Sequence, residues 1–574
     1  MIRAKNLRQG ILQKGLALAL TTVLALGALA GCGTYENAEG SSASGGQISN
    51  QSNQSSGSGA AGGEVITNSG DKVVKIAISA DPEFTFDAIG DSLMVTNGLL
   101  REGLTRYGDG VLVDGLAESY EHNEDYTKWT FHLRESGWSN GEPVTADDWV
   151  YAIGAMLDGT AQLSYADFLY EIKNAREVYT GKKDVSELGV IAQDEKTLVF
   201  ELAYPVTYFP YLITHPMHFG YDREFTQKVG VENIGTEAEY SISNGPFYVD
   251  SWEHDNLLVF KKNPYYWNKD NIAIDQVNVY VIPNQATQVN LFLNGELDVV
   301  DFAYQRLSAI ENAGFTAQTY NNGRTAYLNY NEANAFLKNK YVRQAISAAI
   351  DRDAIVNGVL HVGSVADGLI PVGLAGDGKK TFREIVGSNL PYVYDVAKAK
   401  ELLQKGLDEL GLSSPSDISF TILATNTDEF IAVTGAIQQL LQDNLGIKVD
   451  VETTDSSALR TRRNAYEYDV LLQSWGADWD DATNFLGGYE RQADANPALF
   501  INADFNAKYH DATYSTDLTE RIRLLGDAEA ILLEEEGITP LYYTGQYYAV
   551  SKRLEGVLRR AVVPYLDLYF AVVK

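Results

Sequence analysis

The chain has 574 residues, 45% of them apolar, which at about 100 to 200 residues per domain is enough for two to four domains with cores of their own. Its 77 acidic residues outnumber its 45 basic residues and give a net charge of -32, which argues against nucleic acid or an anionic lipid surface as a partner. The only cysteine is Cys32, so the sequence excludes intramolecular disulfides, Cys-based zinc sites, iron–sulfur clusters and Cys-x-x-Cys redox motifs.

The first 31 residues have the layout of a secretory signal. Residues 1–14 are basic and polar, and residues 15–31 form the apolar run GLALALTTVLALGALAG. The run ends in Leu29-Ala30-Gly31-Cys32, which resembles the bacterial lipobox. The resemblance implies that Cys32 becomes a lipidated mature N-terminus, whose two or three acyl chains anchor the protein at ~0.8 kcal/mol per buried CH₂. The alternative is a soluble secreted protein with an incidental cysteine.

Residues 32–70 are rich in Gly, Ser, Asn and Gln and have almost no apolar side chains, which predicts a flexible tether. A tether of this length spans roughly 30 to 40 Å. No second apolar run of spanning length follows it. We therefore expect the folded body at the outer face of the bacterial cytoplasmic membrane, on the cell surface or in the periplasm, with partners that carry out any transport through the bilayer.

Between residues 110 and 300 the sequence pattern is mainly that of β-strands. Alternating apolar residues predict strands at 128–133 (KWTFHL), 196–202 and 278–282. This part of the body is expected to be mixed α+β.

Two helices are predicted after this region. One covers residues 341–360, with Asn339 available as its N-cap and an apolar face that packs on the core. The other begins after Asp395 as N-cap and ends near Gly406.

Strand and helix patterns alternate between residues 418 and 478. Strands are predicted at 418–422 and 447–451, with a helix at 429–444 between them. A short helix at 456–465 precedes a third strand, which starts at Tyr468 and runs into residues 475–478 (WGAD). This order predicts an α/β domain with a largely parallel sheet.

Residues 137–141 (GWSNG) match the G-x-S-x-G nucleophile elbow, which requires a strand before the serine and a helix directly after it. Here Asn140-Gly141 is a turn pair followed by Glu142-Pro143, and the helix pattern begins only at Thr145 or later. We interpret the segment as a plain turn.

No other motif predicts catalysis or a metal. His215 and His218 could face one ion, but no third ligand is placed near them, so a structural role is expected. Asp478, Asp480 and Asp481 lack the alternating oxygen ligands, central Gly and closing Glu of a calcium loop. The sequence has no Walker loop and no dinucleotide fingerprint. We expect a protein that is not an enzyme, with no catalytic residue, no metal and no cofactor.

Several sequence blocks together resemble the extracellular solute-binding proteins of oligopeptide and dipeptide ABC importers. The similarity covers roughly residues 75 to 570, and its blocks recur in the family's order. They are 116–120 (LAESY), 129–134 (WTFHLR), 138–148 (WSNGEPVTADD), 243–247 (SNGPF), 262–267 (KNPYYW), 294–298 (NGELD), 342–345 (VRQA) with 350–352 (IDR), and 394–395 (YD) with 398–399 (KA).

The resemblance implies a two-lobed clamp like that of periplasmic binding proteins, mixed α/β, with an extra flanking domain. Lobe I would comprise residues 71–102, 237–320 and 541–574. The flanking domain II would fill 103–236 and lobe III would fill 321–540. Hinges are expected near residues 320 and 540, with the ligand enclosed between the lobes.

The resemblance also implies an acidic contact for a peptide's α-ammonium. In the family the acid of a W-x-A-D block makes this contact, and here the block ends in Asp478. An enclosed ammonium needs a carboxylate, because removing one partner of a buried ion pair costs ~3 to 5 kcal/mol. The alternative for Asp478 is a surface or capping aspartate. No cation for the ligand's carboxyl terminus is identified.

A bound peptide also needs partners for its backbone, since each unpaired buried donor or acceptor costs ~1 to 3 kcal/mol. The first candidate strand edge ends at Ala477, and a second lies around Gly90, which allows close backbone approach. Side chains would be seated loosely in hydrated pockets. The candidate ligand-binding residues are Asp478, Trp475, Gly476, Ala477, Ile89, Gly90 and Tyr165, with Tyr170 as a weaker candidate.

The function implied is capture of short peptides by a monomer that delivers them to ABC permease and ATPase subunits. One alternative is a non-peptide solute, such as a metal chelate, haem or an oligosaccharide. Another is a surface sensor or adhesin for signalling peptides. Hydrolysis is a third alternative, supported only by the serine motif at residues 137–141.

Overall fold

The structure is a computed structural model that describes residues 72–86, 91–108, 111–159, 163, 166–490, 500–562 and 564–574, with the backbone alone for 91–94. The predicted signal, tether and lipidation at Cys32 therefore lie outside the described residues. Within those ranges, no helix is long and apolar enough to cross a membrane.

A four-stranded sheet joins the start of the described chain to its middle. Its strand order is β1-β10-β9-β8, with β1 (Val73–Ile78) parallel to β10 (Gln276–Val281) and the other pairs antiparallel. β9 (Leu257–Lys262) and β8 (Phe247–Glu253) complete it. Every second residue of β1 and β10 is buried, as expected for strands with one face on a core. The predicted strand at 278–282 is confirmed by β10.

The same region contains helices and short strands around this sheet. They are α1 (Asp91–Leu100), η5 (Lys269–Asn271), α6 (Gln285–Leu293), η6 (Tyr304–Arg306), α7 (Leu307–Asn312), β18 (Leu554–Glu555), β19 (Leu558–Arg559), β20 (Leu566–Asp567) and β21 (Val572–Val573).

A second four-stranded sheet, of order β4-β5-β7-β6, is antiparallel throughout. β5 (Lys128–Leu133) and β7 (Thr197–Glu201) confirm the strands predicted at 128–133 and 196–202. A capping box between Thr145 and Asp148 starts α2 (Ala146–Leu157), which packs on the sheet. The other elements are β2 (Thr105–Tyr107), β3 (Leu112–Asp114), β4 (Ala117–His122), η1 (Ala166–Leu169), α3 (Ala175–Tyr179), η2 (Val185–Glu187), β6 (Val190–Asp194), α4 (Phe209–Leu212), η3 (Pro216–His218), α5 (Arg223–Val229) and η4 (Ala238–Tyr240).

A seven-stranded sheet forms the largest layer, with the order β11-β17-β12-β16-β14-β15 and β13 added beside β17. Only the pairs β14–β15 and β14–β16 are parallel, and the other pairs are antiparallel. The three strands from which a parallel sheet was predicted, β14, β15 and β16, are parallel to one another as expected. The sheet as a whole is not largely parallel, because β11, β12 and β13 run in the opposite direction. The strands are β11 (Val299–Phe302), β12 (Gln318–Tyr330), β13 (Ser364–Val365), β14 (Ser419–Thr425), β15 (Lys448–Thr454), β16 (Val470–Gly476) and β17 (Ile538–Val550).

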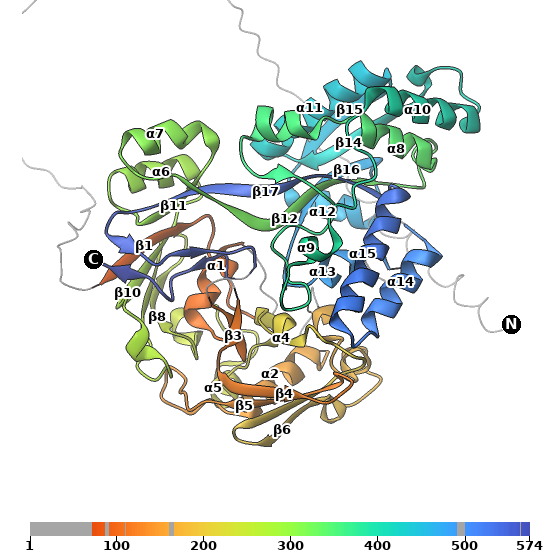
Figure 1. The fold of residues 1–574 in the computed structure, drawn as a ribbon. Helices are drawn as coiled ribbons and strands as arrows, with labels where there is room; N and C mark the ends of the chain where they lie inside the picture. Colours follow the sequence, from red (N-terminus) through yellow and green to blue (C-terminus); the bar gives the residue numbers. More distant parts are fainter. Residues whose placement is uncertain are drawn as a thin grey trace, which may run out of the picture. The chain divides into compact units, whose positions relative to one another are not determined.

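Successive residues of the central strands face different helices, as the period of two requires. Ile422 and Val470 pack in one core with α8, α10 and α11, whereas Leu423 and Leu471 pack with Leu459 of α12. Figure 1 shows α8, α10 and α11 over this part of the sheet. The helices here are α8 (Lys340–Ala349), η7 (Ala354–Leu360), α9 (Phe382–Val386), α10 (Val396–Leu410), η8 (Pro415–Asp417), α11 (Asp428–Leu445), α12 (Ser456–Asn464), α13 (Thr483–Leu486), η9 (Gly487–Tyr489), α14 (Ala503–Thr513) and α15 (Leu518–Glu534).

The helix predicted over 341–360 is two helices. Asn339 caps α8 as expected, but α8 ends before Ile350, whose φ of -93° and ψ of 117° are extended. The break turns Arg352 inward, where its Nε donates to the carbonyl of Pro540 at 2.8 Å. Asp351 then caps the next helical segment by accepting from the N–H of Ala354.

The helix capped by Asp395 also differs from the prediction at its end. It runs through Gly406 to Leu410 and stops at Gly411, which has the left-handed φ of 68°. Gly406 instead allows close packing, since a Cβ at this position would lie 2.8 Å from Cγ2 of Val342 on α8.

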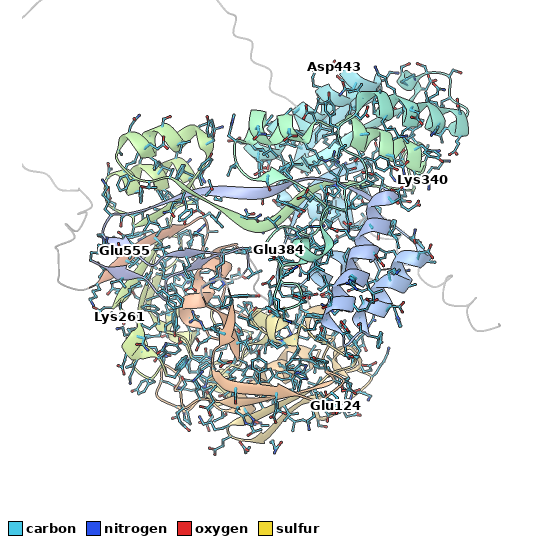
Figure 2. All side chains as sticks on the ribbon, in the orientation of Figure 1. Glu124, Lys261, Lys340, Glu384, Asp443 and Glu555 are labelled. Atoms are coloured by element: carbon cyan, nitrogen blue, oxygen red, sulfur yellow. The ribbon has the colours of Figure 1, made fainter. Side chains whose placement is uncertain are left out.

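β12 and β17 are each 13 residues long, or roughly 43 Å at 3.3 Å per residue. They run side by side from the α6 and α7 layer to the layer that contains β16 and β14 (Figure 1). The pairing is irregular between Asn321 and Thr325. Charged side chains such as Glu124, Asp443 and Glu555 are exposed at the periphery (Figure 2).

A buried carboxylate on α15 gives a test of this architecture. Glu529 is 0% exposed, pairs with Arg383, and accepts from the backbone N–H groups of Leu369 at 2.7 Å and Ile370 at 2.9 Å. We predict that Glu529→Ala lowers the free energy of unfolding by about 3 to 5 kcal/mol, because it leaves a buried guanidinium unpaired. Urea unfolding followed by circular dichroism measures this loss.

The control is Asp527→Ala on the same helix, whose carboxylate is 55% exposed and pairs with Lys508. It should cost about 1 kcal/mol or less. Equal unfolding midpoints for the two variants would contradict the assignment of Glu529 as a structural anchor.

Candidate ligand-binding site

The C-terminal half of β16 has an open edge. β12 pairs with β16 along its whole length, from Val470 to Gly476. On its other side β14 pairs only with Val470 and Leu471. Among the described residues, no strand pairs with positions 472–476 on that side.

The register fixes which backbone groups face this edge. The N–H of Ala477 donates to the carbonyl of Gly323 at 3.1 Å, which makes these two residues a hydrogen-bonded pair of the antiparallel ladder. Hydrogen-bonded and non-hydrogen-bonded pairs alternate, so the N–H and C=O groups of Ser474 and Gly476 point away from β12. Among the described residues, no strand pairs with these outward groups, although Gly476 itself is buried.

Asp478 lies just beyond the end of this edge and is half-buried. Asn484 on α13 contacts it twice, since its Nδ2 donates to Oδ2 of Asp478 at 3.2 Å and its Oδ1 accepts from the Asp478 N–H at 3.4 Å. The same Oδ1 accepts from Nε1 of Trp475 at 2.8 Å. One amide therefore positions both ends of the WGAD segment.

Burial raises the pKa of Asp478 from 3.8 to about 6, against the opposing effects of the Asn484 hydrogen bond and the Arg324 charge. Asp167, on η1 of the flanking region, raises it further. Two carboxylates therefore act on each other in a partly dehydrated place, where the charge of Arg324 offsets part of theirs.

Gly476 brings Arg324 over the end of the strand. A Cβ at position 476 would lie 2.9 Å from Cγ and 3.0 Å from Cζ of Arg324, so any side chain here would push the guanidinium away. Burial raises the pKa of Glu429 at the start of α11. The charge of Arg324 acts on this carboxyl as well and lowers its pKa by a smaller amount.

The two following acids are engaged elsewhere. Oδ1 of Asp480 accepts from the N–H of Ala375 at 2.6 Å. Asp481 forms a bidentate pair with Arg521, with both N···O distances at 2.8 Å and both side chains buried. These contacts leave Asp478 as the acid of this segment that is placed to meet a ligand.

Trp479 connects the site to the flanking region. It is 8% exposed and belongs to the hydrophobic core built mainly by residues 104–242. Its ring meets Phe168 edge to face, with ring centroids 5.1 Å apart. Trp479, the neighbour of Asp478, thus packs against Phe168, the neighbour of Asp167.

The rejected motifs have structural roles. In the segment 137–141 the N–H of Gly141 donates to the carbonyl of Trp138 at 2.9 Å, and Gly141 has a φ of 96°, which confirms a turn.

His215 and His218 are buried, and burial lowers the pKa of each to about 3. No group of three or more His, Cys, Asp or Glu side chains that could hold a metal occurs in the described ranges.

The structure brings together Trp475, Gly476, Ala477 and Asp478 from the predicted set. Ile89, Gly90 and Tyr165 lie outside the described residues. Tyr170, the weaker candidate, packs on the core of the flanking region beside Tyr179, with ring centroids 6.3 Å apart.

Sequence reasoning missed Asn484, Asp167 and Arg324. Asn484 lies six residues after Asp478, and its amide could have been suspected as a local partner of the WGAD segment. Asp167 and Arg324 come from distant parts of the chain, and no local pattern connects them to Asp478.

Residues 111–497 match the family described as bacterial extracellular solute-binding proteins, family 5 Middle. The chain belongs to this family. The predicted resemblance is therefore confirmed, and with it the mixed α/β fold of the two-lobed binding proteins.

Individual proteins of similar sequence or structure support this family assignment. The chain is 31% identical over 479 residues to the oligopeptide-binding protein OppA of Bacillus subtilis, covering 81% of this chain and 86% of that protein. It is similar to Listeria monocytogenes OppA bound to peptide, with 28% identity, a TM-score of 0.73, and coverage of 88% of this chain and 99% of the other. It is also similar to Haemophilus influenzae OppA in complex with RPPGFSPFR, with 26% identity, a TM-score of 0.74, and coverage of 88% and 99%.

We predict that Asn484→Leu raises the pKa of Asp478 above its value of about 6, because the variant removes a hydrogen bond to the ionised carboxylate. NMR of selectively ¹³C-labelled aspartate carboxyls measures this shift. The control is Asn290→Leu, an exposed amide on α6, which should leave the titration unchanged. An unchanged Asp478 titration in Asn484→Leu would show that the amide does not support the carboxylate.

Proposed function

We propose that this protein captures short peptides between its lobes and delivers them to the permease and ATPase subunits of an ABC importer, without catalysis. The observation that carries the proposal is the open edge of β16 ending at a half-buried carboxylate, Asp478. Membership in a solute-binding family with peptide-binding relatives supports it.

The open edge fits an extended backbone. A peptide strand placed beside residues 472–476 would pair with the outward N–H and C=O groups of Ser474 and Gly476. Such pairing ignores side-chain identity, so peptides of many sequences would be accepted. The adjacent Gln473 and Trp475 line the same strand with polar side-chain groups.

Asp478, at the end of the open edge, is placed to pair with the α-ammonium group of a peptide. A cation beside Asp478 would neutralise a carboxylate whose ionisation is opposed by burial and by Asp167. Arg324 offsets part of this charge in the ligand-free protein. A peptide bound with its amino end at residue 478 and its chain along β16 would satisfy both features at once.

The proposed division into lobes follows the cores. Lobe I is proposed as residues 71–102, 237–320 and 541–574, the flanking domain as 103–236 and lobe III as 321–540. Three hydrophobic clusters centred on these parts support the division. Ile89, Gly90 and Tyr165 remain proposed ligand contacts.

The attachment and assembly are also proposed. Lipid on Cys32 would anchor a monomer at the outer face of the cytoplasmic membrane, and residues 32–70 would tether the folded body to it. Membership in an extracellular solute-binding family supports a place outside that membrane.

Calorimetry with tri- to pentapeptides tests the ammonium contact. We predict that Asp478→Asn weakens binding by about 100-fold or more, because a buried ion pair loses one partner, worth ~3 to 5 kcal/mol. N-acetylation of the peptide should weaken binding to the wild type similarly and have little effect in the variant. The control is Asp480→Asn, which alters a nearby acid that accepts from Ala375 instead.

Three results would change the proposal. Undiminished peptide affinity in Asp478→Asn would remove Asp478 from the site. No binding of any peptide, together with a co-purified chelate, haem or sugar in a native mass spectrum, would favour the non-peptide alternative. Peptide binding without neighbouring permease and ATPase genes would favour a sensor.

The pKa of Asp478 predicts two pH effects of opposite sign. Peptide affinity should be greatest near pH 7, fall by up to tenfold per pH unit well below pH 6 as the Asp478 carboxylate is protonated, and fall again above about pH 8 as the free peptide's α-ammonium loses its proton. In the ligand-free protein the folded-state pKa lies above the unfolded value of 3.8, so Asp478 contributes stability at low pH that is lost as pH rises through about 6.

Titration calorimetry and thermal unfolding between pH 4.5 and 8, each compared with Asp478→Asn, separate these effects. Subtracting the variant's pH profile from that of the wild type removes the contributions of the other buried acids, which both proteins share. An identical pH profile of peptide affinity in the two proteins would contradict the role of the Asp478 carboxylate.

A further inference from the structure

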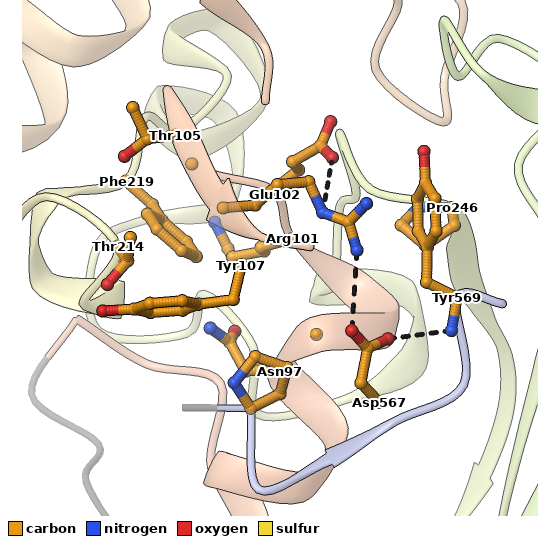
Figure 3. A pocket seen from close by; sticks show the side chains of 14 residues that line it. Asn97, Arg101, Glu102, Thr105, Tyr107, Thr214, Phe219, Pro246, Asp567 and Tyr569 are labelled. Carbon is orange, nitrogen blue, oxygen red and sulfur yellow. Dashed lines mark hydrogen bonds and ion pairs between the residues drawn. The ribbon is translucent and has the colours of Figure 1, made fainter. Parts of the chain in front are cut away.

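Charged side chains around the cavity shown in Figure 3 pair with one another. The cavity has a volume of about 40 Å³, which has room for a few water molecules and is too small for a peptide. Nε of Arg106 lies 3.4 Å from Oε1 of Glu102, and its Nη2 lies 3.7 Å from Oδ2 of Asp567. The charges that bear on a peptide ligand lie instead at the end of β16.

Arg324 lies across the end of β16 because its cross-strand partner is a glycine. The two residues pair directly in the ladder between β12 and β16, and side chains of directly opposite residues share one face of a sheet. A Cβ on Gly476 would lie 2.9 Å from Cγ and 3.1 Å from Nε of Arg324. The half-buried arginine side chain therefore occupies the space that a side chain at position 476 would need.

This space is next to the proposed ammonium contact. Asp478 lies two residues beyond Gly476, and the alternation along an extended chain returns to the same face after two residues. Burial raises the pKa of Asp478, and the charge of Arg324 opposes this rise. Arg324 is thus a cation beside the carboxylate to which a peptide's α-ammonium would bind.

A second carboxylate lies within reach of the same guanidinium charge. Burial raises the pKa of Glu429, at the start of α11, and the charge of Arg324 again opposes the rise. Oε1 of Glu429 accepts from the hydroxyl of Tyr542 at 2.8 Å, which positions this carboxylate. One arginine therefore acts on two carboxylates, and an ammonium at Asp478 would give each of them a cation of its own.

We propose that Arg324 is an internal counter-ion of Asp478, which the α-ammonium of a bound peptide displaces toward Glu429. This inference rests on the proposed peptide-binding function. Arg324 offsets the charge of Asp478 before a peptide binds, and it competes with the ammonium when one does. It is a specificity-determining residue, because its effect is confined to ligands that carry a free amino terminus.

Calorimetry at about pH 7.5, where Asp478 is ionised and most of the peptide keeps its ammonium, tests this competition. Arg324→Met should bind tetrapeptides with a free amino terminus about tenfold more tightly than the wild type does, because a positive charge close to the ammonium is removed. Affinity for the N-acetylated tetrapeptides should be unchanged, whereas a general structural defect would alter both affinities. Arg324→Lys keeps the charge and should bind both peptides as the wild type does.

Glu429→Gln should change the affinity in the opposite direction. Without the Glu429 carboxylate the guanidinium is held more strongly by Asp478, so free-amino peptides should bind about fivefold more weakly. In the Arg324→Met background the same substitution should change affinity by less than about twofold, because the two effects are coupled through one guanidinium. The control is Asp428→Asn, the neighbouring exposed carboxylate on α11, which should also change affinity by less than about twofold.

Equal or weaker binding of free-amino peptides by Arg324→Met would overturn the proposal, and so would an equal gain for the acetylated peptides. If Arg324→Met does not fold, the comparison of Glu429→Gln with Asp428→Asn decides, and equal affinities of these two variants would refute the competition. Failure of the proposed function itself is distinguishable. It would appear as wild-type affinity that neither Asp478→Asn nor N-acetylation of the peptide changes.

Discussion

The antiparallel ladder between β12 and β16 is the constraint on which the candidate site depends. It joins Arg324–Tyr330 to Val470–Gly476 and ends at the bond from the Ala477 N–H to Gly323. Because side chains and hydrogen-bonding groups alternate along a strand, this one register decides which groups face the open edge and which pack inward. A slip of one residue would turn the outward groups of Ser474 and Gly476 toward β12.

The three carboxylates of the segment after this ladder, Asp478, Asp480 and Asp481, have different surroundings. Asp481 is neutralised by Arg521, and Asp480 is held by the backbone of Ala375. Asp478 is supported by the neutral amide of Asn484 and by the charge of Arg324. The same residue type thus has a structural role at one position and is placed for ligand binding at another.

Local patterns predicted much of the fold. The alternation at 128–133 is confirmed residue for residue by β5, and Asn339 and Asp395 cap the helices expected of them. Each of these features depends on neighbours in sequence, which is why it could be predicted. The family resemblance supplied Asp478 and the WGAD segment.

Features that depend on distant contacts could not be predicted from local patterns. The helix expected over 341–360 breaks so that Arg352 reaches Pro540, nearly 200 residues later. The sheet as a whole is not largely parallel, because β12, from a distant part of the chain, pairs antiparallel with β16. Asp167 and Arg324 approach Asp478 for the same reason, since only the tertiary fold brings these segments together.

The C-terminal segment has a consequence for how the protein is made. Arg553 donates to the carbonyl of Val73, 480 residues away, and Arg560 donates to that of Tyr107, 453 residues away. Trp479 likewise completes a core whose other members were synthesised hundreds of residues earlier. Native contacts of such long range slow folding, because loop closure precedes any gain from contact. The segments around Val73 and Tyr107 therefore cannot complete their native contacts until residues 553–560 have been synthesised.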